Sequence, residues 1–103
     1  MNRALRRRHL RAVDLLEAEG ATGTAVAQAV GATAPTATRN YLARLASAGL
    51  VDARGRGTKA KGYVLTAAGR RQLLVDEVVR AADDPAVSED ALRAALNVLR
   101  RGA

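Results

Sequence analysis

The sequence predicts a mostly α-helical fold that contains one small β-hairpin. Apolar residues recur at helical spacing in five segments, and glycine, proline or a capping residue bounds these segments. Between the third and fourth segments, VDA and YVL contain the β-branched and aromatic residues of short strands, and they flank the loop RGRGTKAKG. No linker long enough to separate two domains interrupts the 103 residues, so we expect a single core.

Three helices are expected before the hairpin. The first covers about residues 4–19 and ends at Gly20, because glycine readily terminates a helix. The second begins after Thr22, whose hydroxyl can accept a hydrogen bond from a first-turn amide, and it ends at Gly31. The third covers residues 35–48. Two helices joined by a few residues have the outline of a helix-turn-helix.

Two further helices are expected after the hairpin. Thr66 caps the first of them, whose apolar stripe consists of Leu73, Leu74, Val78 and Val79. The segment DDPAV ends this helix. Ser88, followed by two acidic residues, marks the start of the last helix, and Arg100 to Gly102 marks its end.

Composition excludes several functional classes. The chain has no cysteine and one histidine, which excludes disulfides, thiolate catalysis, thiol redox sensing and Cys-ligated zinc. No apolar run reaches 18 residues and the N-terminus lacks a secretory signal pattern, so we expect a cytoplasmic protein with no membrane partner. Carboxylates are expected on solvated helix faces or at helix starts, so we expect no enzyme, cofactor or metal. These carboxylates are Asp14, Glu17, Asp76, Glu77, Asp83, Asp84, Glu89 and Asp90.

Net charge is concentrated in the first part of the chain. Residues 1–61 contain 11 basic and 4 acidic residues, a net charge of +7, whereas residues 62–103 contain six of each. This asymmetry indicates a polyanionic partner for the first part and a packing or association role for the second. The chain has no Phe or Trp for stacking against single-stranded bases, so duplex DNA is the favoured partner.

Three short motifs resemble those of a known family. They are AQAVG at residues 27–31, the leucines and GLV at residues 42–51, and YVLTAAGRRQL at residues 63–73. In this order and spacing they resemble the winged helix-turn-helix regulators of the MarR and ArsR type. The resemblance implies a winged helix-turn-helix DNA-binding domain at residues 1–82, with residues 83–103 as a C-terminal helix of the same domain for association or packing.

One feature departs from the family pattern. The family places a serine cap directly before the proline of the third helix, whereas this chain has GATAP. Either Ala34 occupies the cap position without a side-chain acceptor, or Thr33 caps the helix and Pro35 lies one position further in. The tilt of the third helix depends on which alternative holds.

The third helix has a candidate reading face for the DNA major groove. At about 100° per residue, Thr38, Leu42 and Leu45 fall on one side, with Tyr41 at its margin. Polar side chains on the other side can contact base edges, with Asn40 suited to adenine and arginine to guanine. The predicted major-groove residues are Thr36, Arg39, Asn40 and Arg44. The alternative is an ordinary solvated amphipathic helix.

Two further groups of cations are candidate DNA contacts. The loop within residues 52–63 combines glycines with four cations, which suits a wing along the minor groove or phosphates. These wing residues are Arg54, Arg56, Lys59 and Lys61, and the predicted backbone contacts in the first helix are Arg6, Arg7, Arg8 and Arg11. The alternatives are a flexible, solvated hairpin tip and a solvated helix face.

The last helix is a candidate dimerisation element. Its apolar stripe consists of Leu92, Ala95, Leu96 and Leu99, which predicts either a homodimer or packing within one chain. We therefore expect a dimeric, nucleoid-associated transcriptional regulator that binds double-stranded DNA. The alternatives are a weakly specific architectural or replication-accessory protein, and a winged-helix module that binds proteins.

Overall fold

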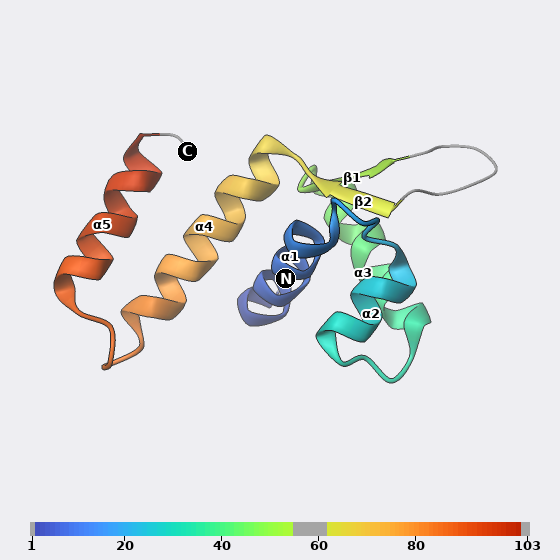
Figure 1. Ribbon diagram of the computed structural model, residues 1–103, viewed down its shortest axis with the longest axis horizontal. Helices are drawn as coiled ribbons and strands as arrows, with labels where there is room; N and C mark the ends of the chain where they lie inside the picture. Colours follow the sequence, from blue (N-terminus) through green and yellow to red (C-terminus); the bar gives the residue numbers. More distant parts are fainter. Residues whose placement is uncertain (1, 55–61, 102–103) are drawn as a thin grey trace.

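The computed structural model describes residues 2–54 and 62–101 and confirms a mostly helical fold with a small antiparallel hairpin (Figure 1). The elements are, in order, α1 (Arg3–Leu16), α2 (Gly23–Val30), α3 (Pro35–Ser47), β1 (Val51–Arg54), β2 (Gly62–Leu65), α4 (Ala67–Ala82) and α5 (Glu89–Arg100). Their order agrees with the order expected from the sequence.

Most helix ends follow the predicted capping signals. The hydroxyls of Thr22, Thr66 and Ser88 each accept a hydrogen bond from the backbone amide three residues later in the chain. The distances are 3.1, 2.9 and 3.1 Å. α1 ends at Leu16, earlier than the expected residue 19. The Gly20 amide donates to the Leu16 carbonyl at 2.9 Å, and Gly20 has a φ of 106°, so the chain leaves the helix through a turn.

The start of α3 decides between the two capping alternatives. Ala34 is the N-cap, its side chain forms no capping hydrogen bond, and Pro35 occupies an initial helix position. Gly31 ends α2 in the left-handed conformation, with a φ of 73°. The longer turn of this chain is therefore accommodated before α3, which begins without a side-chain acceptor for its first amides.

The core lies between α1 and the helix pair α2–α3. Leu10 and Val13 of α1 are fully buried, as are Leu42 and Leu45 of α3. Val26 of α2 completes this centre, and the residues that extend the core toward the hairpin and α4 are Val51, Leu65 and Leu73. In Figure 1, α2, α3 and the hairpin gather at one end of the molecule and α5 lies at the other.

The base of the hairpin is hydrogen-bonded to the segment before α2. β1 and β2 pair in register from Val51 with Leu65 to Arg54 with Gly62. The amide of Tyr63 also donates to the carbonyl of Ala21 at 2.9 Å, which forms an additional antiparallel bridge. This bridge ties the position of the hairpin to the start of α2.

The position of Asp76 differs from the sequence expectation. Asp76 was expected on a solvated helix face, but the structure buries it completely where α4 packs against α1. Its neighbour in the expected apolar stripe, Leu73, is also buried. A charged residue occupies this position because Arg6 of α1 reaches across to pair with it.

α5 packs against α4 and has no buried residue. Three of the four predicted stripe residues, Leu92, Ala95 and Leu99, are half-buried, as expected for packing within one chain. Leu96 is 46% exposed and Val98 is 39% exposed. Within the described residues, no helix has both the length and the apolar character needed to cross a bilayer.

The close approach of Gly69 in α4 to the backbone of Leu50, just before β1, predicts an unusual response to Gly69→Ala. Alanine normally favours a helix over glycine by about 0.8 to 1 kcal/mol. Here a methyl group would collide with the carbonyl of Leu50, whose oxygen already accepts from the Thr66 amide at 3.1 Å. We expect Gly69→Ala to lower the free energy of unfolding by about 1 to 3 kcal/mol in denaturant titrations. A more stable variant would contradict this packing.

Candidate nucleic-acid interface

The structure confirms the predicted division of α3 into two faces. Thr38, Tyr41, Leu42 and Leu45 are buried against the rest of the domain. The four predicted major-groove residues, Thr36, Arg39, Asn40 and Arg44, are all exposed. We call these four residues the α3 face. Because the opposite side of the helix is packed, this face is held outward and does not depend on a partner for its orientation.

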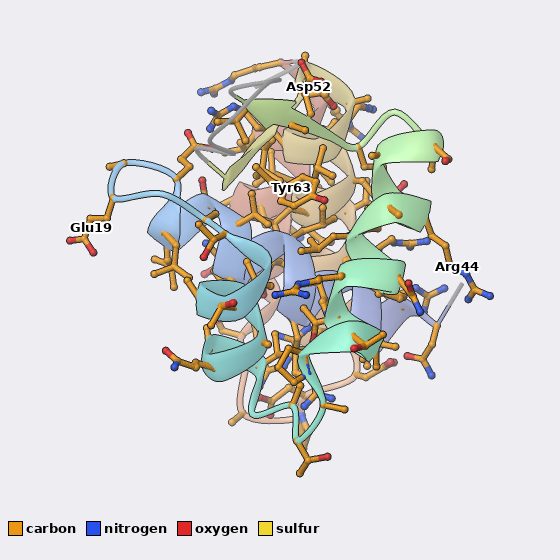
Figure 2. The ribbon with its side chains drawn as sticks, turned by 90° about the vertical axis from the view of Figure 1, so that its right-hand side faces the viewer. Glu19, Arg44, Asp52 and Tyr63 are labelled. Carbon is orange, nitrogen blue, oxygen red and sulfur yellow. The ribbon has the colours of Figure 1, made fainter. Side chains whose placement is uncertain are left out.

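The α3 face lies in an acid-free part of the chain. No acidic residue occurs between Glu19 and Asp52 in the sequence. Figure 2 shows Arg44 pointing outward from α3, with Glu19 and Asp52 lying away from it. Within the described residues, neither Arg39 nor Arg44 forms an ion pair. Their guanidinium groups therefore give the α3 face a positive potential suited to a polyanion.

Two of the four predicted backbone contacts on α1 point toward α4. Arg6 donates two hydrogen bonds to Asp76, at 2.8 and 2.7 Å, and these bonds raise the pKa of its guanidinium. Arg11 lies 2.7 Å from Glu77 and 3.5 Å from Asp14. These paired guanidinium groups are not brought to the α3 face, because α4 supplies a carboxylate partner to each of them.

The other two predicted contacts on α1 lie on different sides of the helix. Arg7 lines a hollow of about 480 Å³ between α1 and α4, together with Arg80 and Asp83. Arg8 lines a hollow of about 380 Å³ whose other walls include Thr33 and the start of α3. Of the four predicted backbone contacts on α1, Arg8 is therefore the one placed beside the α2–α3 pair.

The predicted wing residues fall mostly outside the described part of the chain. Arg56, Lys59 and Lys61 lie outside the described residues. Arg54 ends β1, where it pairs with Gly62, and its side chain also lies outside the description. The structure describes the base of the hairpin, and the prediction for its cations stays a prediction.

A contact between His9 of α1 and Tyr41 of α3 lies on the buried side of α3. The rings of His9 and Tyr41 have centroids 4.3 Å apart. Nδ1 of His9 donates to the carbonyl of Leu5 at 2.8 Å, and burial lowers the pKa of His9, which favours the neutral ring. Burial raises the pKa of Tyr41, whose hydroxyl has no hydrogen-bond partner in the described residues. This pair packs α3 against α1.

Gly23 lies beside the α3 face, although it is not among the site residues predicted from the sequence. A methyl group at Gly23 would lie 2.8 Å from Cγ of Arg39, so the arginine side chain lies directly against the start of α2. No periodicity or motif signals this contact, because it joins two helices across the turn between them.

No comparison assigns this site to known proteins. Protein-family models, curated proteins and solved structures give no significant match to the chain. In the part of the chain that the structure describes, no group of three or more His, Asp or Glu residues could hold a metal ion. Function is therefore inferred from the charge, exposure and packing of the residues themselves.

The buried ion pair predicts different effects for neighbouring arginines. Arg6→Ala leaves the fully buried Asp76 carboxylate without its cation, which costs about 3 to 5 kcal/mol of stability. Arg7→Ala removes a cation with no ion pair in the described residues, so we expect a change within about 0.5 kcal/mol. Urea denaturation of both variants measures the difference. Equal stabilities would contradict the structural role assigned to Arg6.

Proposed function

We propose that this protein is a winged helix-turn-helix protein that binds double-stranded DNA and regulates transcription as a homodimer. The observation that carries the proposal is the α3 face, which is exposed, free of acids and rich in hydrogen-bonding groups. The proposed role is not enzymatic and needs no cofactor or metal. Its proposed location is the cytoplasm, in association with the nucleoid.

α2 and α3 supply the helix-turn-helix of this proposal. α3 lies in the major groove, whose width admits an α-helix and whose base edges present distinct donors and acceptors. Asn40 is suited to a bidentate contact with adenine, and Arg39 or Arg44 to a contact with guanine. Thr36, at the beginning of α3, is suited to a contact with a base or phosphate.

The hairpin supplies the proposed wing. Its base is held by the Ala21–Tyr63 bridge, next to the α2–α3 pair. The wing cations of the sequence prediction would then contact the minor groove or the phosphates beside the major groove that α3 occupies. Arg8 is the α1 residue best placed to add a phosphate contact, because it lines the hollow beside the turn before α3.

The last two helices supply the proposed dimer contact. Part of the predicted stripe already packs on α4, so the contact must use the side of α5 on which Leu96 stays exposed. A two-fold dimer would present two α3 faces to half-sites about one helical turn apart. α5 lies at the end of the molecule opposite α3, which keeps this contact away from the DNA (Figure 1).

One observation favours an architectural protein as the second candidate. The exposed side of α3 also contains Ala37, Ala43 and Ser47, whose small side chains offer few contacts to base edges. A protein with this surface could bind duplexes mainly through phosphates, with weak sequence preference. A third candidate is a winged-helix module that binds proteins. It predicts that the chain shows no salt-dependent retention on duplex DNA.

Selection from random duplexes at a stated salt concentration tests the proposed function. We expect the wild-type chain to enrich a defined motif, because each arginine or asparagine pair with a base contributes about 1 to 3 kcal/mol of discrimination. Arg39→Ala or Asn40→Ala should relax the preference at individual positions. Arg56→Ala should weaken all duplexes alike and reduce the salt slope by about one.

Arg93→Ala is the matched control for base reading, because Arg93 lies exposed on α5, at the opposite end of the molecule from α3, and should leave the enriched motif unchanged. Uniform recovery of all duplexes would favour the architectural protein. Absence of salt-dependent binding to any duplex would contradict DNA binding altogether.

Size-exclusion chromatography with light scattering tests the proposed dimer. Leu96→Glu introduces a charge at an exposed apolar position of α5, so we expect it to convert the dimer into a monomer. Ala94→Glu adds the same charge to an exposed position of the same helix, about 200° away from Leu96, and should leave the dimer intact. A wild-type chain that is monomeric at micromolar concentration would contradict the dimer.

A further inference from the structure

We propose that Gly23 is a specificity-determining residue, because its missing side chain allows Arg39 to lie against the start of α2. This inference rests on the proposed function and names a positioning residue outside the α3 face. Gly23 itself need not contact DNA. Its effect on base reading comes from the conformation that it permits for a guanidinium group of α3.

The contact between the two residues is close along much of the arginine side chain. A methyl group on Gly23 would lie 2.8 Å from Cγ of Arg39, 3.3 Å from Nε and 3.6 Å from Cδ. The first distance is shorter than carbon atoms tolerate. Because the contact includes Cγ near the helix, a shift of the guanidinium end alone cannot relieve it. Any side chain at position 23 therefore requires a different Arg39 conformation.

The backbone of α2 has little freedom to move away instead. Ala21, two residues before Gly23, is fully buried and accepts the Tyr63 amide at 2.9 Å. The Thr22 hydroxyl accepts the Ala25 amide at 3.1 Å, and the Thr22 carbonyl accepts the Val26 amide at 2.9 Å. These bonds hold the backbone of Gly23 from both sides.

α3 is equally constrained on its own side. Thr38 precedes Arg39 and is 2% exposed, and Leu42 in the next turn is fully buried. Moving α3 away from α2 would open the core that these residues form. The part of the contact that can change is therefore the Arg39 side chain, which is also a predicted reader of base edges.

Backbone geometry gives no other reason for glycine at this position. The described glycines with positive φ are Gly20, Gly31, Gly49 and Gly62, and Gly23 is not among them. Gly23 lies at the start of a helix, where alanine is the better helix former. Room for Arg39 is the requirement that the structure shows here.

A double-mutant cycle on DNA tests the inference. Binding to the selected duplex and to its single-base variants is compared for wild type, Gly23→Ala, Arg39→Ala and the double variant. We expect Gly23→Ala to reduce discrimination at one base pair by about fivefold or more, within the range of about 5- to 150-fold for an arginine contact. In the Arg39→Ala background, Gly23→Ala should have no further effect. Equal losses in both backgrounds would overturn the inference, because they would mean that Gly23 acts independently of Arg39.

Thermal unfolding of the same variants separates this effect from a folding defect. We expect Gly23→Ala to be at least as stable as wild type, because alanine favours the helix. A large loss of stability would overturn the inference, because it would show that the core, rather than the arginine, yields to the added methyl group.

A measurement without DNA separates this inference from the proposed function. The side-chain Nε–H resonance of Arg39, assigned by its absence in Arg39→Ala, should shift in Gly23→Ala while amides of the buried core stay in place. An unchanged resonance would overturn the inference whatever the protein binds. If the resonance shifts but wild type enriches no duplex motif, the proposed function fails, and the role of Gly23 in specificity fails with it.

Discussion

The arrangement of the domain depends on the buried ion pair between Arg6 and Asp76. A fully buried carboxylate is stable only when charge and hydrogen bonds compensate its lost hydration. Arg6 supplies two hydrogen bonds, and Gln72 supplies a third at 3.0 Å. Because the bidentate geometry allows little sliding, the pair fixes how α4 lies along α1. The position of α5, which packs on α4, follows from the same contact.

This pairing also divides the surface electrically. The carboxylates of α1 and α4 meet arginines from both helices, with Arg11 on Glu77 and Arg70 between Asp14 and Glu17. These exposed pairs contribute little stability in water. What these pairs do is hold the carboxylates of Asp14, Glu17 and Glu77 between α1 and α4. The α3 face on the other side of the core has no acid to neutralise its arginines, which is the electrostatic condition for binding a polyanion.

A second constraint operates where the hairpin meets α2. Gly62 has a φ of 91°, and a side chain there would come within 2.6 Å of the Ala21 backbone. Two residues after Ala21, Gly23 likewise lets the side chain of Arg39 lie close to the backbone of α2. Gly62 in the hairpin and Gly23 at the start of α2 therefore let the hairpin, α2 and α3 come together around residues 21–23. If α3 and the hairpin contact one DNA molecule, this junction sets their relative geometry.

The sequence by itself determined the five helices, the caps at Thr22, Thr66 and Ser88, the hairpin and the packed side of α3, because periodicity and capping are local properties of the chain. It also located the acid-free segment that contains the α3 face. It could not show that Asp76 is buried, since a carboxylate in an amphipathic helix is normally solvated and only Arg6, 70 positions earlier, makes burial tolerable. The same limit applied to Arg11 and to Gly23. Only the tertiary structure decided that Arg6 and Arg11 are paired with carboxylates and that the Arg39 side chain lies against Gly23. Both results depend on contacts between residues far apart in the chain.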